Sequence, residues 1–356
     1  MKKEESQFVV KVLLSTLAIV IAVIGAKCNE LESREGGDHR GIQDTPKITI
    51  LSPSRIDDSY DHYTIVDTAI VEPTKIFATA ALSRKLFLFD MQSNEWRTVS
   101  EFPNVDGSLW HLTFVDNSIG FVTGDRGTLL KTTDGGKTWK KVTPFTTYDL
   151  YEIVFTDSRT GYLVGDMTLV VEGFGLSYRV AVFKTTDGGE RWQQVYSKKN
   201  AIGPIFAIAA ISSSECIIAV GGRQLLRTKD GGKSWQKVSG VELSENAWIT
   251  GIDFASNRTG WLIDSKGGLY RSEDGGITWS REELPDESGR CKWQALDINE
   301  TGRGVAVSED GCVLFTSDGQ RWRRLETAIS DQLEFAKVFH SEALITGNKN
   351  LWRFKF

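Results

Sequence analysis

One short pattern of Asp, Gly and Trp occurs five times in the chain at nearly constant spacing. Its clearest copy covers residues 132–139, and successive aspartates lie 53, 43, 44 and 44 residues apart. A degenerate sixth copy begins at Asp90 and ends at Trp96. Self-similarity with a period of about 40 to 50 residues is typical of propellers and solenoids rather than of one enzyme-like core. The Asp and Trp of the five copies are Asp134 and Trp139, Asp187 and Trp192, Asp230 and Trp235, Asp274 and Trp279, and Asp318 and Trp322.

Each repeat contains four short runs that are rich in Val, Ile, Phe, Tyr and Thr. In the second repeat these runs are residues 110–114, 120–123, 128–132 and 139–142, with Asp-, Asn- and Gly-containing turns between them. β-Branched and aromatic residues favour strands, and such turns join them as hairpins. No stretch after residue 40 has a sustained helical period. Each repeat is therefore predicted to form a four-stranded blade.

Alignment of the repeats predicts seven blades. Their first strands begin near Tyr63, Trp110, Tyr151, Phe206, Ile249, Trp293 and Phe335. The last repeat ends at Phe356 after its third strand and lacks an outer strand. Residues 47–51 have strand composition, and we predict that they pair with the last blade and close the ring, which would hide the sheet edges of an open array.

The repeated pattern resembles the Asp-box, or bacterial neuraminidase repeat, of sialidases, sortilin-type receptors, some glycosidases and photosystem II assembly factors. The predicted fold class is therefore all-β, a seven-bladed β-propeller of four-stranded blades with Asp-box hairpins. In each box we expect the Asp to accept hydrogen bonds within its hairpin, the glycines to adopt positive φ and the Trp to fill space between blades. A catalytic group is not needed five times over, so the boxes indicate architecture.

The first 28 residues are predicted to be a signal peptide or a membrane anchor. Lys2, Lys3 and Lys11 precede an uncharged run at residues 12–26, and lysines before such a run favour a cytoplasmic amino terminus. Three outcomes stay open: cleavage, retention as an anchor, or lipidation at Cys28. Residues 29–46 have the composition of a flexible polar tether. The propeller, residues 47–356, is expected outside the cytoplasm, on the periplasmic or thylakoid-lumen side.

Composition limits the cofactors and partners that we expect. The 356 residues carry a formal net charge of −5, which gives no general electrostatic case for nucleic acid. The four His are scattered singly and no Cys or His pair has zinc-like spacing, so we predict no metal site and no cofactor. Cys291 and Cys312 fall in one predicted blade, either as a disulfide or as two small buried residues.

An enzymatic function is an alternative, because sialidases carry the same boxes. The arginine that opens the sialidase active site lies in an Arg-Ile-Pro type motif, and the nearest sequence here, at Arg55, Ile56 and Asp57, has no Pro. A glycosidase needs two suitably spaced carboxylates. The first strands that line the central channel carry His111, Glu152, Asp253 and Asp297. Glu152 lies near the start of its strand and Asp253 and Asp297 lie further along theirs, so we expect the acids at different depths, as hydrogen-bonded channel carboxylates rather than an acid and a base.

Among the families with Asp-boxes, residues 48–356 are most similar to the photosystem II stability and assembly factors. The likeness includes an exported single propeller of about this length, with repeats such as residues 153–155, 161–166 and 183–189. It implies a non-enzymatic factor that binds early reaction-centre proteins during assembly. The alternative is an Asp-box propeller that binds carbohydrate or hydrolyses glycosides.

A partner-binding surface is predicted on the face opposite the boxes. The interval between Asp134 and Asp187 is about nine residues above the norm, which places an insertion at residues 167–179, between second and third strands. We call this insertion the finger. Together with a mixed-charge rim, it is expected to bind a membrane-protein or envelope partner, with the chain itself monomeric. The predicted contact residues are Val170, Val171, Phe174, Leu176 and Tyr178 on the finger and Arg126, Arg223 and Lys266 on the rim.

Overall fold

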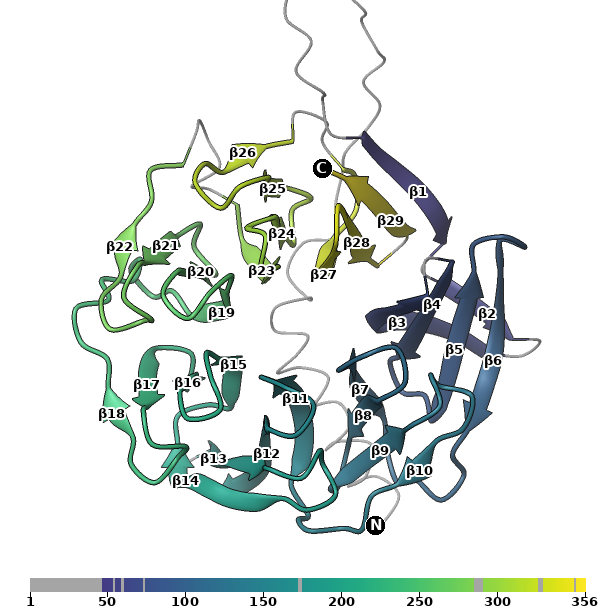
Figure 1. Ribbon diagram of the computed structural model, residues 1–356, viewed down its shortest axis with the longest axis horizontal. Helices are drawn as coiled ribbons and strands as arrows, with labels where there is room; N and C mark the ends of the chain where they lie inside the picture. The colour runs from purple at the N-terminus through teal and green to yellow at the C-terminus, as the bar shows by residue number, and fades with distance from the viewer. Residues whose placement is uncertain are drawn as a thin grey trace, which may run out of the picture. The chain divides into compact units, whose positions relative to one another are not determined.

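Seven β-sheets follow one another around a central axis in the computed structural model (Figure 1). The structure describes residues 47–53, 55–58, 61–72, 74–171, 175–284, 291–325, 329–348 and 350–356, which all lie in the unit Thr45–Phe356. The signal or anchor at residues 1–28 and the tether at residues 29–46 are outside the described residues. No helix among the residues described is long and apolar enough to cross a membrane.

The blades have their innermost strand first in sequence and their outermost strand last. Blade 1 consists of β3 (Asp61–Glu72), β4 (Lys75–Ala80), β5 (Lys85–Asp90) and β6 (Glu95–Glu101). Blade 2 consists of β7 (Leu109–Phe114), β8 (Gly120–Gly124), β9 (Thr128–Thr132) and β10 (Lys140–Lys141). Blade 3 consists of β11 (Asp149–Phe155), β12 (Gly161–Val171), β13 (Gly175–Thr185) and β14 (Gln193–Ala201). Blade 4 consists of β15 (Ile205–Ala210), β16 (Cys216–Val220), β17 (Gln224–Thr228) and β18 (Gln236–Lys237).

The remaining blades repeat this order, with one exception in the last. Blade 5 consists of β19 (Ile249–Phe254), β20 (Gly260–Asp264), β21 (Leu269–Ser272) and β22 (Ser280–Arg281). Blade 6 consists of β23 (Trp293–Ile298), β24 (Gly304–Ser308), β25 (Val313–Thr316) and β26 (Arg323–Arg324). Blade 7 takes only β27 (Leu333–Phe339), β28 (Glu342–Gly347) and β29 (Asn350–Lys355) from the carboxyl end.

The outer strand of blade 7 comes from the other end of the described chain. β1 (Lys47–Pro53) pairs antiparallel with β29, from Lys47 opposite Lys355 to Pro53 opposite Asn350, so the two ends of the propeller lie side by side (Figure 1). The ring closure predicted from residues 47–51 is therefore present. Residues 55–57, which the sequence places before the first full blade, form part of β2 (Arg55–Asp58), a fifth strand that pairs with the start of β3.

The core is a ring of hydrophobic clusters between neighbouring blades. All but one of these clusters join residues of two adjacent sheets; Phe77 and Leu88 of blade 1, for example, pack with Leu112 and Val122 of blade 2. The last cluster joins Ile76 of blade 1 to residues of blade 7. All five box tryptophans lie in or against the cluster shared with the preceding blade. Burial between sheets is what stabilises this arrangement, because a single blade is too thin to enclose its own apolar faces.

Candidate partner-binding face and central channel

The box aspartates are engaged inside their own hairpins. In blade 2, Asp134 accepts hydrogen bonds from the backbone N–H and the hydroxyl of Thr138, at 2.9 and 2.6 Å, and from the hydroxyl of Thr132 at 2.8 Å. The bonds from Thr138 lower the pKa of Asp134 to about 2, because they stabilise the charged carboxylate. Both oxygens are therefore used in holding the turn.

A Ser or Thr two residues before each box Asp completes the hairpin. These hydroxyls, which the sequence analysis did not single out, belong to Thr132, Thr185, Thr228, Ser272 and Thr316, each about 1% exposed. The Thr185 hydroxyl donates to Asp187 and accepts the backbone N–H of Gly189. Gly189 has φ +83° and a Cβ there would lie 2.6 Å from the Phe121 ring of blade 2. The box glycine thus permits both the turn and close packing of neighbouring blades.

The loops that join second to third strands lie on the face opposite the boxes, as expected, but only part of the predicted rim is free there. The guanidinium of Arg126 forms an ion pair with the exposed Asp106. Lys266 is exposed, and its backbone N–H is bonded to Asp264. Arg223 is exposed beside a glycine turn at residues 221–222. Asp166, in the part of β12 that leads into the finger, is only 1% exposed.

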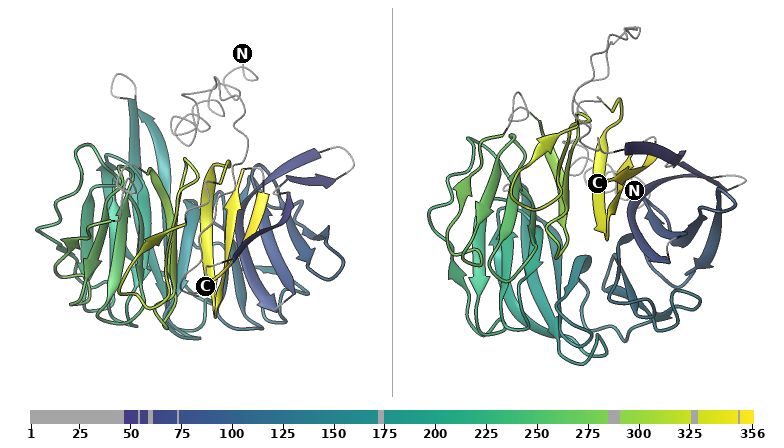
Figure 2. Two further views of the ribbon diagram at one scale, coloured as in Figure 1. Left: turned by 90° about the horizontal axis from the view of Figure 1, so that it is seen from above. Right: turned by 45° about the horizontal axis from the view of Figure 1, so that its top comes forward.

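The predicted finger is an extension of β12 and β13 beyond the other blades' hairpins. The two strands pair from Gly161 opposite Thr185 to Val171 opposite Gly175, and the hairpin projects from the ring (Figure 2). Tyr178 is half-buried and packs against the cluster between blades 3 and 4. Phe174 lies outside the described residues, and the side chains of Val170, Val171 and Leu176 are not described either, so their role as contacts stays a prediction.

Channel carboxylates on inner strands accept backbone hydrogen bonds from the next blade. Asp67 accepts the N–H of Leu112, Asp253 that of Ile298 and Asp297 that of Val338, at 2.7 to 2.8 Å. The partners lie 41 to 45 residues away in sequence. These three bonds join neighbouring inner strands around the channel, and Asp67 is a member of this set that the sequence analysis missed.

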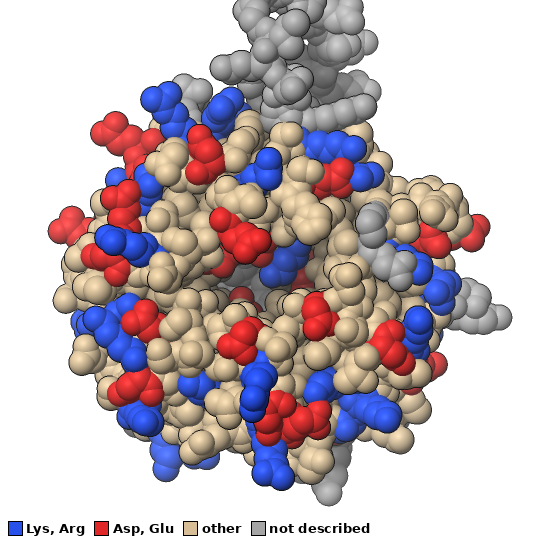
Figure 3. Space-filling model, viewed as in Figure 1, with Lys and Arg blue, Asp and Glu red and all other residues tan. Residues whose placement is uncertain are grey.

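Two basic residues of the channel, His111 and Lys337, lie beside these same carboxylates. The Nδ1 atom of His111 lies 2.8 Å from Asp67, and the Nζ atom of Lys337 lies 3.2 Å from Asp297. Burial raises the pKa of Glu152. Both acidic and basic side chains surround the central opening in the view of Figure 3. The oxygens of Asp253 and Asp297 are all bonded to backbone N–H groups or to Lys337, so neither side chain is a free acid or base.

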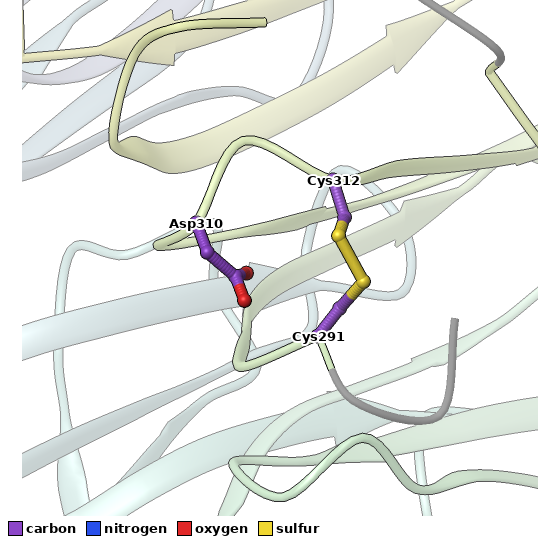
Figure 4. Close-up of side chains that lie close together, drawn as sticks. All are labelled: Cys291, Asp310 and Cys312. Carbon is purple, nitrogen blue, oxygen red and sulfur yellow. A yellow bond between two sulfur atoms is a disulfide. The ribbon is translucent and has the colours of Figure 1, made fainter. Parts of the chain in front are cut away.

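The two alternatives for Cys291 and Cys312 are settled in favour of a disulfide. The bond joins the segment before β23 to the turn between β24 and β25, and the carboxylate of Asp310 lies beside it (Figure 4). These three residues are close enough to ligate a metal ion, but sulfur atoms bonded to each other do not supply thiolate ligands. Cys216, in β16, is buried and free.

A closed ring of seven blades with box hairpins on one face defines an Asp-box β-propeller. The family described as "Photosynthesis system II assembly factor YCF48" matches residues 88–147, 140–244 and 237–334, and the chain belongs to this family.

Two relatives are named as photosystem II assembly factors. The chain is 26% identical over 129 residues to "Photosystem II assembly lipoprotein Ycf48" of Synechococcus sp., with 35% of each protein covered. It is 26% identical over 307 residues to "Photosystem II stability/assembly factor HCF136, chloroplastic" of Arabidopsis thaliana, covering 67% of this chain and 73% of that protein. The chain thus spans about a third of the first relative's length and about three quarters of the second's.

Solved structures with low sequence identity share the fold. "YCF48 bound to D1 peptide" has a TM-score of 0.63 at 16% identity and covers 88% of this chain and 98% of its own. A virginiamycin B lyase from Staphylococcus aureus has a TM-score of 0.64 at 10% identity, covering 87% and 99%. Since a propeller supports many functions, these two likenesses describe the fold alone.

Proposed function

We propose that this chain is a non-enzymatic, exported propeller that binds a membrane-protein partner during photosystem II assembly. The observation that carries the proposal is the family match over residues 88–334. Two relatives named as photosystem II assembly factors and a neighbour whose title names a D1 peptide support the same partner class. The names "lipoprotein" and "chloroplastic" of the two relatives support export and attachment through residues 1–28.

The channel supports a binding function rather than hydrolysis. A glycosidase needs one carboxyl group that gives up a proton and a second that acts as base or nucleophile. Burial is the main cause of the raised pKa of Asp253, and the charge of the nearby Asp297 raises that pKa further. Yet each carboxylate accepts a backbone N–H from the next blade. These bonds join neighbouring inner strands and account for the positions of both side chains. No specific observation therefore favours the carbohydrate alternative.

The finger and the rim around it are the proposed docking surface. The hairpin of β12 and β13 is the longest in the described propeller, and it projects on the face that the box hairpins leave free. Projecting apolar and aromatic side chains are the residues that anchor many protein interfaces. The proposed contacts are Val170, Val171, Phe174, Leu176 and Tyr178, with Arg126, Arg223 and Lys266 on the rim.

The test is a crosslinking pull-down from native membranes with a shortened finger. Thr168 pairs with Tyr178, so replacing residues 169–177 by a two-residue Asn-Gly turn keeps this pair and the packing of Tyr178. We expect photosystem II reaction-centre proteins with the full-length chain and at least a tenfold lower recovery with the shortened finger. Arg159→Glu, on an exposed turn of the box face, is the matched control and should recover the partner fully.

The outcomes separate the parts of the proposal. Full recovery by the shortened variant would exclude the finger as docking surface. Recovery of other envelope proteins in place of reaction-centre proteins would keep the binding function and exclude photosystem II assembly.

A further inference from the structure

A group of aromatic and acidic side chains lies at the root of the finger, around the inner end of blade 3. Asp149 and Asp166 are opposite each other in the β11–β12 ladder, and Thr168 is opposite Tyr178 in the β12–β13 ladder. Cross-strand neighbours and residues two apart in a strand share a sheet face. Asp149, Asp166 and Tyr178 therefore face the same way. We call these three residues, with Tyr151 and Trp110, the root cluster.

The ring of Tyr151 connects the carboxylates to the neighbouring blade. Its centroid lies 6.4 Å from that of Trp110, which belongs to β7 of blade 2. Burial, followed by the charges of Asp166 and Asp149, raises the pKa of the Tyr151 hydroxyl well above its ordinary value. The hydroxyl is thus within electrostatic reach of both carboxylates. The root cluster spans the boundary between blades 2 and 3 rather than lying within one sheet.

Neither carboxylate of the root cluster is ion-paired among the described residues, although the charge of Arg126 acts on Asp149 and lowers its pKa against the larger effect of burial. Asp166 is 1% exposed; among the described residues its Oδ2 atom has no hydrogen-bond partner and its Oδ1 atom has only a 3.4 Å contact with the Thr168 hydroxyl. Asp149 accepts one bond, from the backbone N–H of Arg126. No ion pair to either carboxylate occurs in the part of the chain that the structure describes. The Arg126 guanidinium binds Asp106 instead, and Arg179 is on the opposite face of β13 from Tyr178.

This arrangement differs from that of the channel acids. Asp67, Asp253 and Asp297 each accept a backbone N–H from the next blade, whereas Asp166 accepts none. Burial and the charge of Asp149 raise the pKa of Asp166 to about 7. Burying a carboxylate without a partner is unfavourable, and a cation placed beside it removes that penalty. Without a cation Asp166 keeps its proton up to about pH 7, and a cationic ligand would favour its charged form.

The aromatic members of the root cluster add affinity for the same kind of charge. Trp110, Tyr151 and Tyr178 are half-buried. The indole of Trp110 is oriented by a 2.6 Å bond from its Nε1–H to Asp125, whose other oxygen accepts the N–H of Ser108. Faces of Trp and Tyr attract ammonium and guanidinium groups, and carboxylates form their strongest hydrogen bonds with them.

An exposed apolar patch adjoins the root cluster. Ala201 of β14 pairs with Tyr178, and the next residue, Ile202, is 91% exposed. Phe206 and Trp248, 38% and 44% exposed, contact each other edge to face with ring centroids 5.3 Å apart. Apolar groups on both sides of a basic residue in a bound segment would find surface here.

We propose that the root cluster binds the cationic head group of an arginine or lysine side chain on the protein partner, with apolar neighbours of that residue resting on Ile202, Phe206 and Trp248. Asp149 is the contacting carboxylate, and Asp166 acts on the cation from beneath it. The identity of the partner rests on the proposed function, but the binding of a cationic side chain can be measured with model peptides and without the partner.

The test uses acetylated and amidated pentapeptides in which Arg, Lys or Gln is flanked by leucines. Calorimetric titration of the full chain should give at least tenfold tighter binding for the Arg or Lys peptide than for the Gln peptide. Asp149→Asn and Asp166→Asn should each remove most of this preference. Glu309→Gln, a carboxylate of blade 6 on the same face that is paired with Lys292, is the matched control and should preserve it.

Equal binding of the three peptides, or an unchanged preference in the Asp149→Asn Asp166→Asn double variant, would overturn the proposal. Circular dichroism melting shows whether each variant is folded, and Asp149→Asn, at a half-buried position with one hydrogen bond, tests the proposal without changing Asp166. If the peptides show no preference while the pull-down succeeds, the root cluster fails and the assembly function stands. If the protein prefers the basic peptides but the pull-down recovers no partner, the root cluster stands and the assembly function fails.

Discussion

At the scale of single residues, two kinds of carboxylate in this propeller differ in what surrounds them. Box aspartates are bonded to groups within four residues in sequence, as Asp230 is to Thr228 and Ser234. Their role can be predicted from sequence because the partners are local and the pattern repeats. The burial of Asp166 cannot be predicted, because its neighbours Asp149, Tyr151 and Tyr178 come from β11 and β13. The hydroxyl two residues before each box Asp was missed, but it is predictable from sequence because a Ser or Thr occupies that position in all five copies.

The hydroxyl of a box can be tested in blade 4. Thr228 is 1% exposed, donates to Asp230 and accepts the N–H of Gly232 at 2.8 Å. Thr228→Val keeps the side-chain shape but leaves that N–H buried without a partner, so we expect the free energy of unfolding to fall by about 1 to 3 kcal/mol. Urea denaturation measures the change. Thr228→Ser should stay within about 1 kcal/mol of wild type, because Ser272 makes the same two bonds in blade 5; an equal loss in both variants would contradict this explanation.

At the scale of elements, closure of the ring depends on one strand from the amino-terminal side. β1 forms six residue pairs with β29, and Ile48 packs against the cluster between blades 6 and 7. The sequence indicated this pairing because the last repeat ends after three strands. The fifth strand of blade 1, β2, was not predicted: the repeat offers no template for it, since the other blades have no strand at that position.

Removing β1 tests the closure. A chain that starts at residue 54 loses the β1–β29 pairs and exposes the β29 edge, whereas a chain that starts at residue 46 keeps them. We expect the shorter chain to unfold at lower urea concentration and to self-associate, because an unpaired edge strand is a template for pairing with other chains. Light scattering and urea denaturation measure both effects. Equal stability and a monomeric state for the two chains would show that three strands suffice in blade 7.

At the scale of the whole molecule, the carboxylates whose pKa values are raised to about 7 lie away from the box hairpins. Hydrogen bonds from Thr138 to Asp134 and from Ser234 to Asp230 hold both pKa values at about 2 on the box face. In the channel and on the opposite face, burial raises the pKa values of Asp166, Asp253 and Glu334 to about 7, with nearby carboxylates adding to the effect. Stability therefore responds to pH in opposite directions in the two regions.

The pH dependence of stability follows from these directions. A carboxyl group whose pKa is raised in the folded state keeps its proton up to about pH 7, while the unfolded chain loses it near pH 4. Its contribution to stability is full below about pH 4 and declines as pH rises to about 7. The box aspartates, whose pKa values are lowered, change the stability only below about pH 4, because their stabilising contribution is lost as the pH falls toward about 2. We therefore expect the free energy of unfolding to decline between about pH 4.5 and 7.

Urea titrations across this pH range measure the decline. Asp166→Asn, which removes one of the raised groups, should flatten it and should stabilise the protein near pH 8 relative to wild type. The same variant should differ little from wild type near pH 4, where Asp166 is protonated in the folded state. A stability that rises from about pH 4.5 to 7 would contradict the assignment.

The sequence by itself determined the features that depend on local, repeated contacts. The period of about 44 residues, the box turns and the three-stranded last repeat together specify seven blades, their order and the closing strand. The tertiary structure alone decided which carboxylates find partners and which do not. Asp67 meets the N–H of Leu112, and Asp166 is buried beside Asp149, Tyr151 and Tyr178, only because separate strands meet once the ring is closed. The contacts of Asp166 do not recur from blade to blade and leave no periodic trace in the sequence, and for this reason the root cluster became visible only in the folded chain.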